Sequence, residues 1–141
     1  MKNGFVKVAA ATPELRVADC PFNTARICKA MDQAFEAGAK IVVFPELSIT
    51  GYTCGDLFNQ EKLLAEAKHE LYHILRRSAQ KDMLVAVGLP WEKDGKLYNV
   101  AAVMCDGRLL GLVPKRNLPN YNEFYEMRNF TPGNEEVEYV K

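Results

Sequence analysis

The 141-residue sequence lacks several features that would place it in a specialised class of protein. It has no excess of charge, because 18 Lys and Arg residues balance 18 Asp and Glu residues, and this balance argues against a nucleic-acid partner or an anionic membrane surface. No apolar run approaches the roughly 20 residues of a membrane-spanning helix, and Lys7 and Pro13 interrupt the short apolar stretch where a signal peptide would lie. The four cysteines form no CxxC pair, which is typical of reduced thiols. We therefore expect a soluble, cytoplasmic protein.

What is present is a globular composition, 48% hydrophobic, in a chain long enough for one domain. Residues 5–11 (FVKVAAA) predict a strand. Residues 23–38 predict a helix, with Asn23 as its N-cap and Gly38 as its stop signal. The continuous apolar run KIVVF, residues 40–44, is typical of a central strand that is covered on both faces.

Further along the chain, the sequence predicts a helix over residues 59–80 and a buried strand over residues 83–90. The apolar stripe of this helix is predicted to consist of Leu64, Ala67, Leu71, Ile74 and Leu75. Residues 96–114 predict a hairpin around Asp106-Gly107, a dipeptide suited to a tight primed turn. A β-α-β-α-β order followed by a hairpin indicates an α/β fold with a mixed sheet. From residue 115 onward the chain is a long polar and aromatic loop, and such loops are usually functional or disordered.

Residues 69–73, HELYH, match the HExxH pattern of zinc peptidases. Helical periodicity, however, places His69 and His73 roughly opposite the apolar stripe, so both should face solvent. They are also the only two histidines in the sequence. We therefore interpret the motif as a solvated helix face, and we predict no metal site.

Two charged residues end apolar strands in a way that indicates chemistry. Glu46 follows IVVFP, and strands of α/β sheets deliver site residues at their carboxyl ends. Lys115 follows LLGLVP in the same manner. A carboxylate and an ammonium that meet in one crevice would supply a general base and a donor to a developing oxyanion. A turn acid and a surface lysine are the ordinary alternatives.

The segments VVFPELSITGY and VPKRNLPNYNEFYEMRNFTPG together resemble the nitrilase, or carbon-nitrogen hydrolase, superfamily. More narrowly, GYTCGDLF and LPNYNEFYE resemble the amino-terminal glutaminase domain of glutamine-dependent NAD synthetases. The resemblance implies a nitrilase-type α-β-β-α sandwich, of which residues 1–141 would be only the amino-terminal half.

The family hydrolyses amides through a thioester with a Glu–Lys–Cys triad. The resemblance implies that Glu46 is the general base and Lys115 the oxyanion-stabilising cation. It implies that Glu123 is the auxiliary carboxylate that orients Lys115 and the leaving amine, with Glu126 as an open alternative. Tyr52 and Tyr121 resemble aromatic residues of the glutamine pocket.

The nucleophilic cysteine of the family lies downstream of the lysine, but no cysteine follows Lys115 here. Cys54 lies in the loop after Glu46 and is in the wrong order for that role. We therefore expect a truncated glutaminase domain that is inactive by itself. Its parent would be a homo-oligomer that passes ammonia from glutamine to a carboxyl-terminal synthetase domain, where ATP and Mg would serve the amidation of deamido-NAD. We expect the glutaminase part to need no cofactor. The alternatives are another amidase or a non-catalytic nitrilase-like assembly domain.

Overall fold

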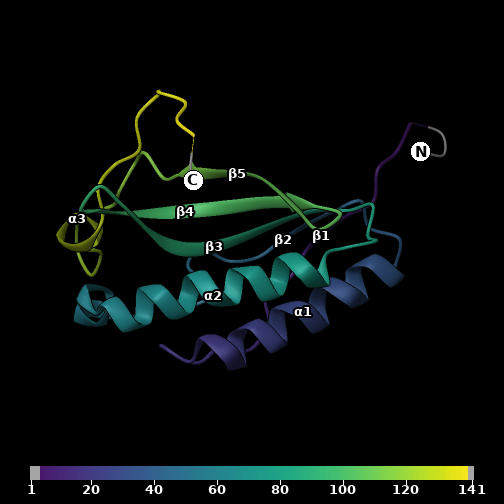
Figure 1. Ribbon diagram of the computed structural model, residues 1–141, viewed down its shortest axis with the longest axis horizontal. Coiled ribbons are helices and arrows are strands. Elements are labelled where there is room, and N and C mark those ends of the chain that lie inside the picture. Colours follow the sequence, from purple (N-terminus) through teal and green to yellow (C-terminus); the bar gives the residue numbers. More distant parts are fainter. Residues whose placement is uncertain (1–3, 140–141) are drawn as a thin grey trace.

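The computed structural model describes residues 4–139, in which one five-stranded sheet carries two long helices on the same face (Figure 1). The strands lie in the order β1-β2-β3-β4-β5, with β1, β2 and β3 parallel and β4 and β5 antiparallel to their neighbours. This arrangement confirms the predicted α/β fold with a mixed sheet. The elements are β1 (Val8–Ala10), α1 (Cys20–Glu36), β2 (Ile41–Val43), the 3-10 helix η1 (Gly55–Asn59), α2 (Glu61–Arg77), β3 (Leu84–Lys93), β4 (Lys96–Cys105), β5 (Arg108–Pro114) and the short helix α3 (Glu126–Asn129).

Helix α1 begins earlier than its sequence suggested, so the predicted N-cap was wrong. Asp19 is the N-cap, and its side chain accepts a hydrogen bond from the backbone N–H of Phe22 at 3.1 Å. Pro21 occupies the first turn, where its missing N–H costs no helical hydrogen bond. Asn23 therefore lies inside the helix and is fully buried, where it bonds to neighbouring loops.

The hairpin at Asp106-Gly107 is confirmed, and the chain contains a second hairpin of the same kind. Asp106 and Gly107 have φ angles of 48° and 72°, which a primed turn requires. Asp94 and Gly95, with φ angles of 52° and 71°, join β3 to β4 in the same way. The same Asp-Gly signal was present at that second turn in the sequence and was missed.

Helix α2 uses most of the predicted apolar stripe to cover the sheet. Ala67, Leu71 and Ile74 are buried, but Leu63 occupies the core in place of the half-buried Leu64. With Ile27 and Met31 of α1, these side chains pack on Val42 of β2 and on Val85 and Val87 of β3 as one apolar core.

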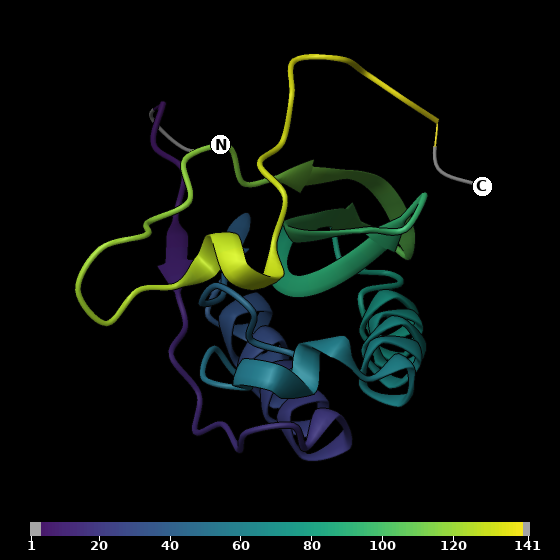
Figure 2. The same ribbon diagram turned by 90° about the vertical axis from the view of Figure 1, so that its left-hand side faces the viewer.

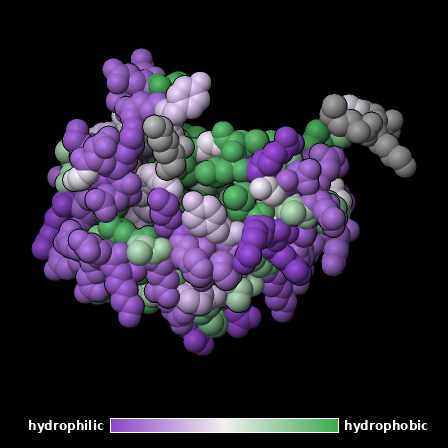
Figure 3. Space-filling view, viewed as in Figure 1, coloured by the Kyte–Doolittle hydropathy of each residue, from purple (hydrophilic) through white to green (hydrophobic). Residues whose placement is uncertain are grey.

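The opposite face of the sheet is largely uncovered in the described residues. The strand register aligns Val8, Ile41 and Leu84 across β1, β2 and β3, and all three are exposed. Hydrophobic side chains gather above the sheet in the view of Figure 3. The prediction that residues 40–44 form a strand covered on both faces is therefore wrong for this chain, because Ile41 and Val43 are exposed on one face.

Candidate active site

Glu46 stands in the loop that follows β2, and the backbone around it is tightly constrained. The next residue, Leu47, is buried and has a φ of 52°, an uncommon left-handed conformation for a residue other than glycine. Gly88 of β3 lies against this loop so closely that a Cβ atom on it would stand 2.8 Å from the carbonyl oxygen of Pro45. The absence of a side chain at Gly88 therefore allows the loop to press against the sheet and hold Glu46 at its edge.

Helix α1 and the residues just before it anchor the same loop. The side-chain amide of Asn23 donates to the carbonyl of Ile49 at 2.9 Å and to that of Arg16 at 2.8 Å. The N–H of Ala18 donates to the carbonyl of Thr50 at 2.7 Å. Buried hydrogen bonds of this kind are costly to leave unmade, so they fix the path of the chain beyond Glu46.

Lys115 follows the last residue of β5 and meets Glu46 at the same edge of the sheet. Its Nζ donates to Oε1 of Glu46 at 2.7 Å and to Oε1 of Glu126 at 2.9 Å. Partial burial by itself lowers the pKa of Lys115, but the hydrogen bonds and charges of the two carboxylates outweigh it, and the pKa is raised above its ordinary value of 10.5. The side chain therefore remains a cation at neutral pH.

Glu126 is the most buried member of this group, since its side chain is 5% exposed against 37% for Glu46. Its Oε1 also accepts a hydrogen bond from the hydroxyl of Tyr52 at 2.7 Å. Burial and then the bond to Glu126 raise the pKa of Tyr52, which keeps the phenol protonated and donating. Oε2 of Glu126 is buried and has no hydrogen-bond partner among the described residues. A buried carboxylate oxygen of this kind is an acceptor without its donor.

Helix α3 brings Glu126 to the site because it docks on η1. Phe130 and Phe58 pack edge to face with ring centroids 5.0 Å apart, and both are buried. Arg128 adds an ion pair to Asp56 at 3.0 Å. Figure 2 shows α3 (yellow) directly above η1 (teal) at this end of the sheet. The loop after β2 and the loop after β5 are thereby joined into one wall.

The predicted site residues fall into two groups. The structure brings Glu46, Lys115 and Tyr52 together around Glu126, which the sequence had left as the alternative to Glu123. Glu123 is exposed, and no hydrogen bond or ion pair joins it to Lys115 in the described chain. Tyr121 is 64% exposed and stacks edge to face on Phe124, with centroids 5.7 Å apart.

Sequence reasoning missed one further side chain at the site, the amide of Asn99 on β4. Its Nδ2 donates to Oε1 of Glu46, and the residue is 3% exposed. A single polar residue inside the apolar strand sequence KLYNVAAVMC was the available signal, because a buried amide requires a partner.

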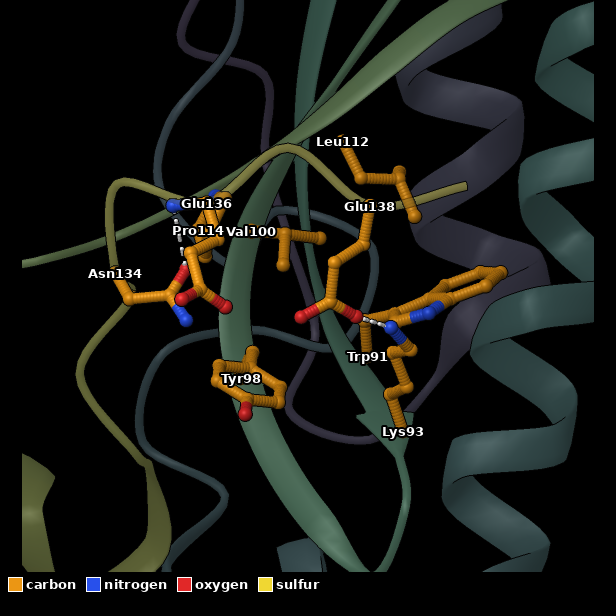
Figure 4. A pocket seen from close by; sticks show the side chains of 10 residues that line it. Trp91, Lys93, Tyr98, Val100, Leu112, Pro114, Asn134, Glu136 and Glu138 are labelled. Atoms are coloured by element: carbon orange, nitrogen blue, oxygen red, sulfur yellow. Dashed lines mark hydrogen bonds and ion pairs between the residues drawn. The ribbon is translucent and has the colours of Figure 1, made fainter. Parts of the chain in front are cut away.

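Glu46, Asn99 and Lys115 line a groove of about 270 Å³, which Gly88 also lines and whose remaining lining is apolar. A second cavity of about 110 Å³ lies beside it, between β3, β4, β5 and residues 133–138 (Figure 4). Trp91 and Tyr98 form its walls, and Lys93 pairs with Glu138 across it. It contains none of the three polar residues of the groove, so we assign the chemistry to the groove.

The cysteines of the chain do not supply an activated thiol to this groove. Burial raises the pKa of Cys20 to about 12 and that of Cys28 to about 11. Burial also raises the pKa of Cys54, whose Sγ donates to the carbonyl of Thr50 at 3.2 Å. None of the four cysteines lines the groove. Thiols with raised pKa values are poor nucleophiles at neutral pH.

The histidines of the HELYH motif are exposed on α2, as predicted. Their rings stack with centroids 4.7 Å apart, and their nitrogens lie within 4.8 Å of a carboxylate oxygen of Glu70. Neither histidine lines the groove.

Among the described residues, no helix combines the length and the apolar character that crossing a bilayer requires.

Comparison of the sequence with known proteins gives one matching family and relatives that share one name. The profile of the carbon-nitrogen hydrolase family matches residues 7–141. The glutamine-dependent NAD(+) synthetase of Mycobacterium tuberculosis is 37% identical over 135 residues, which cover 96% of this chain and 20% of that protein. The enzyme of the same name from Aquifex aeolicus is 40% identical over 119 residues, or 84% of this chain and 21% of that protein.

Solved structures agree with these relatives. A glutamine-dependent NAD(+) synthetase from Cytophaga hutchinsonii superimposes with a TM-score of 0.88 at 30% identity, over 94% of this chain and 22% of that one. An amidase from Nesterenkonia sp. superimposes with a TM-score of 0.79 over the whole of this chain and 53% of that one. Its identity of 23% supports the nitrilase-type fold alone. The chain thus spans about a fifth of the length of its curated relatives.

Proposed function

Because this chain belongs to the carbon-nitrogen hydrolase family, we propose that it forms the amino-terminal part of a glutaminase domain within a glutamine-dependent NAD synthetase. The observation that carries the proposal is the position of Lys115 Nζ, 2.7 Å from Glu46 and 2.9 Å from Glu126. The relatives at 37% and 40% identity support the choice of glutamine over other amides. In this proposal the nucleophilic cysteine comes from residues beyond these 141.

The proposed chemistry begins with proton transfer from that thiol to Glu46. The thiolate attacks the carboxamide carbon of glutamine, and the negative charge that develops on the carbonyl oxygen is stabilised by the Lys115 ammonium. Glu46 then returns the proton to the amide nitrogen as the C–N bond breaks, which releases ammonia and leaves a thioester. Water hydrolyses the thioester, with Glu46 again taking a proton, and yields glutamate and the free thiol.

Glu126 is the acid that we assign to the auxiliary role, in place of Glu123. One of its oxygens holds Lys115 and Tyr52, and its other oxygen is buried without a donor. The N–H₂ group of a bound carboxamide would supply that donor and so orient the leaving amine. Tyr52 then acts through Glu126, and a substrate-binding role for the exposed Tyr121 stays a prediction.

The ammonia would serve the amidation of deamido-NAD in a separate synthetase domain. ATP and Mg²⁺ belong to that domain, and no step on the residues described here involves them. Homo-oligomerisation of the parent and a cytoplasmic location stay predictions. The open apolar sheet face is consistent with further protein packing on this half-domain.

The test is ammonia release by the full-length protein from glutamine, asparagine and simple aliphatic amides. Selective hydrolysis of glutamine, with NAD formed from deamido-NAD and ATP, is the expected result. Hydrolysis of aliphatic amides in preference to glutamine would instead identify another amidase. Absence of hydrolysis of every amide would favour a non-catalytic assembly domain.

A further inference from the structure

We propose that Asn99 is a positioning residue that fixes the general base and the cation of this site relative to each other. The inference rests on the proposed amide hydrolysis and adds to it a residue from β4, the strand that separates β3 from β5. Asn99 does not reach a substrate in this role; it acts through Glu46 and Lys115.

The side chain of Asn99 determines where the carboxylate of Glu46 lies. Its Nδ2 donates to Oε1 of Glu46 across 53 residues of sequence, and the residue is buried. A carboxylate can only accept hydrogen bonds, so the nitrogen and not the oxygen of the amide must face it. The amide therefore has a single productive orientation.

The backbone of Asn99 fixes the position of the Lys115 backbone. The N–H of Lys115 donates to the carbonyl oxygen of Asn99 at 2.8 Å, which extends the pairing of β4 with β5 by one step beyond Val100 and Pro114. One residue of a rigid central strand thus holds both partners. A ladder hydrogen bond and a side-chain hydrogen bond from the same residue leave little freedom in the separation of the two groups.

The choice of a neutral amide has a chemical consequence. Asn99 and Lys115 both donate to Oε1 of Glu46, and no donor among the described residues reaches Oε2. Oε2 is therefore the oxygen available for proton transfer. A second cation at position 99 would hold the carboxylate equally well, but it would also oppose protonation of a group that must accept a proton.

The experiment uses the full-length protein with Asn99→Leu, which keeps the approximate size and removes the donor. Thr24→Val is the matched control, because Thr24 is also buried and its hydroxyl has no partner among the described residues. The readouts are kcat and KM for glutamine, the rate at which iodoacetamide alkylates the nucleophilic thiol, and a crystal structure of the variant. We expect Asn99→Leu to lower kcat and the alkylation rate by about 10- to 100-fold, since small misplacements of reacting groups cost this much. KM should stay within about threefold, and Glu46 should be displaced in the crystal structure.

Asn99→Asp is the second variant, in case Asn99→Leu fails to fold. Its carboxyl group can donate to Glu46 only when protonated, so its activity relative to wild type should rise as the pH falls. The other titratable groups around Glu46 are Lys115, Glu126 and Tyr52, and they are the same in both proteins. A role confined to folding predicts no such pH dependence.

Unchanged kcat in Asn99→Leu, or a Glu46 carboxylate that keeps its place in the variant's crystal structure, would overturn the inference. Equal losses in kcat for Asn99→Leu and Thr24→Val would do the same. The proposed function fails separately, if the wild-type protein releases no ammonia from glutamine. In that case a displaced Glu46 in the variant would still support the positioning role.

Discussion

Two clusters in this molecule use the same kinds of charge with the signs exchanged. At the sheet edge, the cation Lys115 lies between the carboxylates of Glu46 and Glu126. On the helical layer, the anion Asp32 of α1 lies between Arg77 at 2.6 Å and Lys81 at 3.3 Å. Both clusters join segments distant in sequence, and ion-pair geometry alone does not distinguish them.

The surroundings of the two clusters differ. The Lys115 cluster stands where β2 and β5 end, and Lys115 and Glu46 line the groove together with the buried Asn99. Each cluster borders a cavity and includes a buried carboxylate oxygen without a hydrogen-bond partner among the described residues, Oε2 of Glu126 and Oδ1 of Asp32, so neither feature separates the two. The Asp32 cluster joins α1 to the end of α2 and the residues after it, and Arg77 is 58% exposed. The position at the carboxyl ends of two strands, where α/β sheets carry their site residues, therefore assigns chemistry to the Lys115 cluster, whereas the Asp32 cluster joins two helices. Four predictions test this distinction.

The largest effect is expected at the general base. In the full-length protein, Glu46→Gln should lower the rate of ammonia release from glutamine by about 10³-fold, because the variant cannot take the thiol proton. Asp32→Asn should keep that rate within about twofold. Steady-state ammonia assays on both proteins make the measurement, and a comparable loss in Asp32→Asn would erase the distinction.

Gly88→Ala should disturb the sheet-edge cluster without changing a charge. The added Cβ would meet backbone atoms of residues 45–47, which cannot yield as a flexible side chain can. We expect a loss of about 2–3 kcal/mol in the free energy of unfolding, together with reduced ammonia release. Gly111→Ala is the control, since no atom lies within 4 Å of a Cβ built there. Denaturant titration of both variants gives the comparison, and equal stabilities would contradict the steric argument.

At the helical cluster the expected effect is small and concerns stability alone. Asp32→Asn should lower Tm by about 3 °C or less, because ion pairs near the surface contribute little and are screened by salt, and the exposed Arg77 remains hydrated without its partner. Calorimetry at low and high ionic strength measures it. A wild-type advantage that survives 1 M salt would show that the pair is not a screened surface contact.

The smallest expected effect is a difference in how the stability that each cluster contributes depends on pH. Partial burial raises the pKa of Asp32, but hydrogen bonds from Arg77 and Lys81 outweigh it and leave the pKa below its ordinary 3.8. The stability it contributes is present above pH 3.8 and is lost as the pH falls through the lower folded value. The contribution of Lys115, whose pKa is raised, is present below pH 10.5 and is lost as the pH rises through the higher folded value.

Denaturant midpoints from pH 2 to pH 11 should therefore separate the clusters. The difference between wild type and Asp32→Asn should shrink at the acid end, and the difference between wild type and Lys115→Met should shrink at the alkaline end. Losses at the opposite ends would refute the assigned pairings.

The sequence by itself determined the strands, both long helices and three residues that meet at the site, Glu46, Lys115 and, through the family resemblance, Tyr52. Apolar runs, an amphipathic stripe and an Asp-Gly turn predicted most of the sheet and both long helices, because these signals act over a few residues. Glu46 and Lys115 were predicted to meet because both follow apolar strands. Their convergence requires β2 and β5 to run in the same direction, which a strand order with two antiparallel steps after β3 provides.

Only the tertiary structure decided which acid serves Lys115 and which amide holds Glu46. Glu123 and Glu126 lie on one loop, and the docking of Phe130 on Phe58 selects Glu126. Asn99 reaches Glu46 from a strand 53 residues away in sequence. Both depend on packing between segments that are distant in the chain. Local sequence patterns report interactions over a few residues only, so they do not predict such contacts.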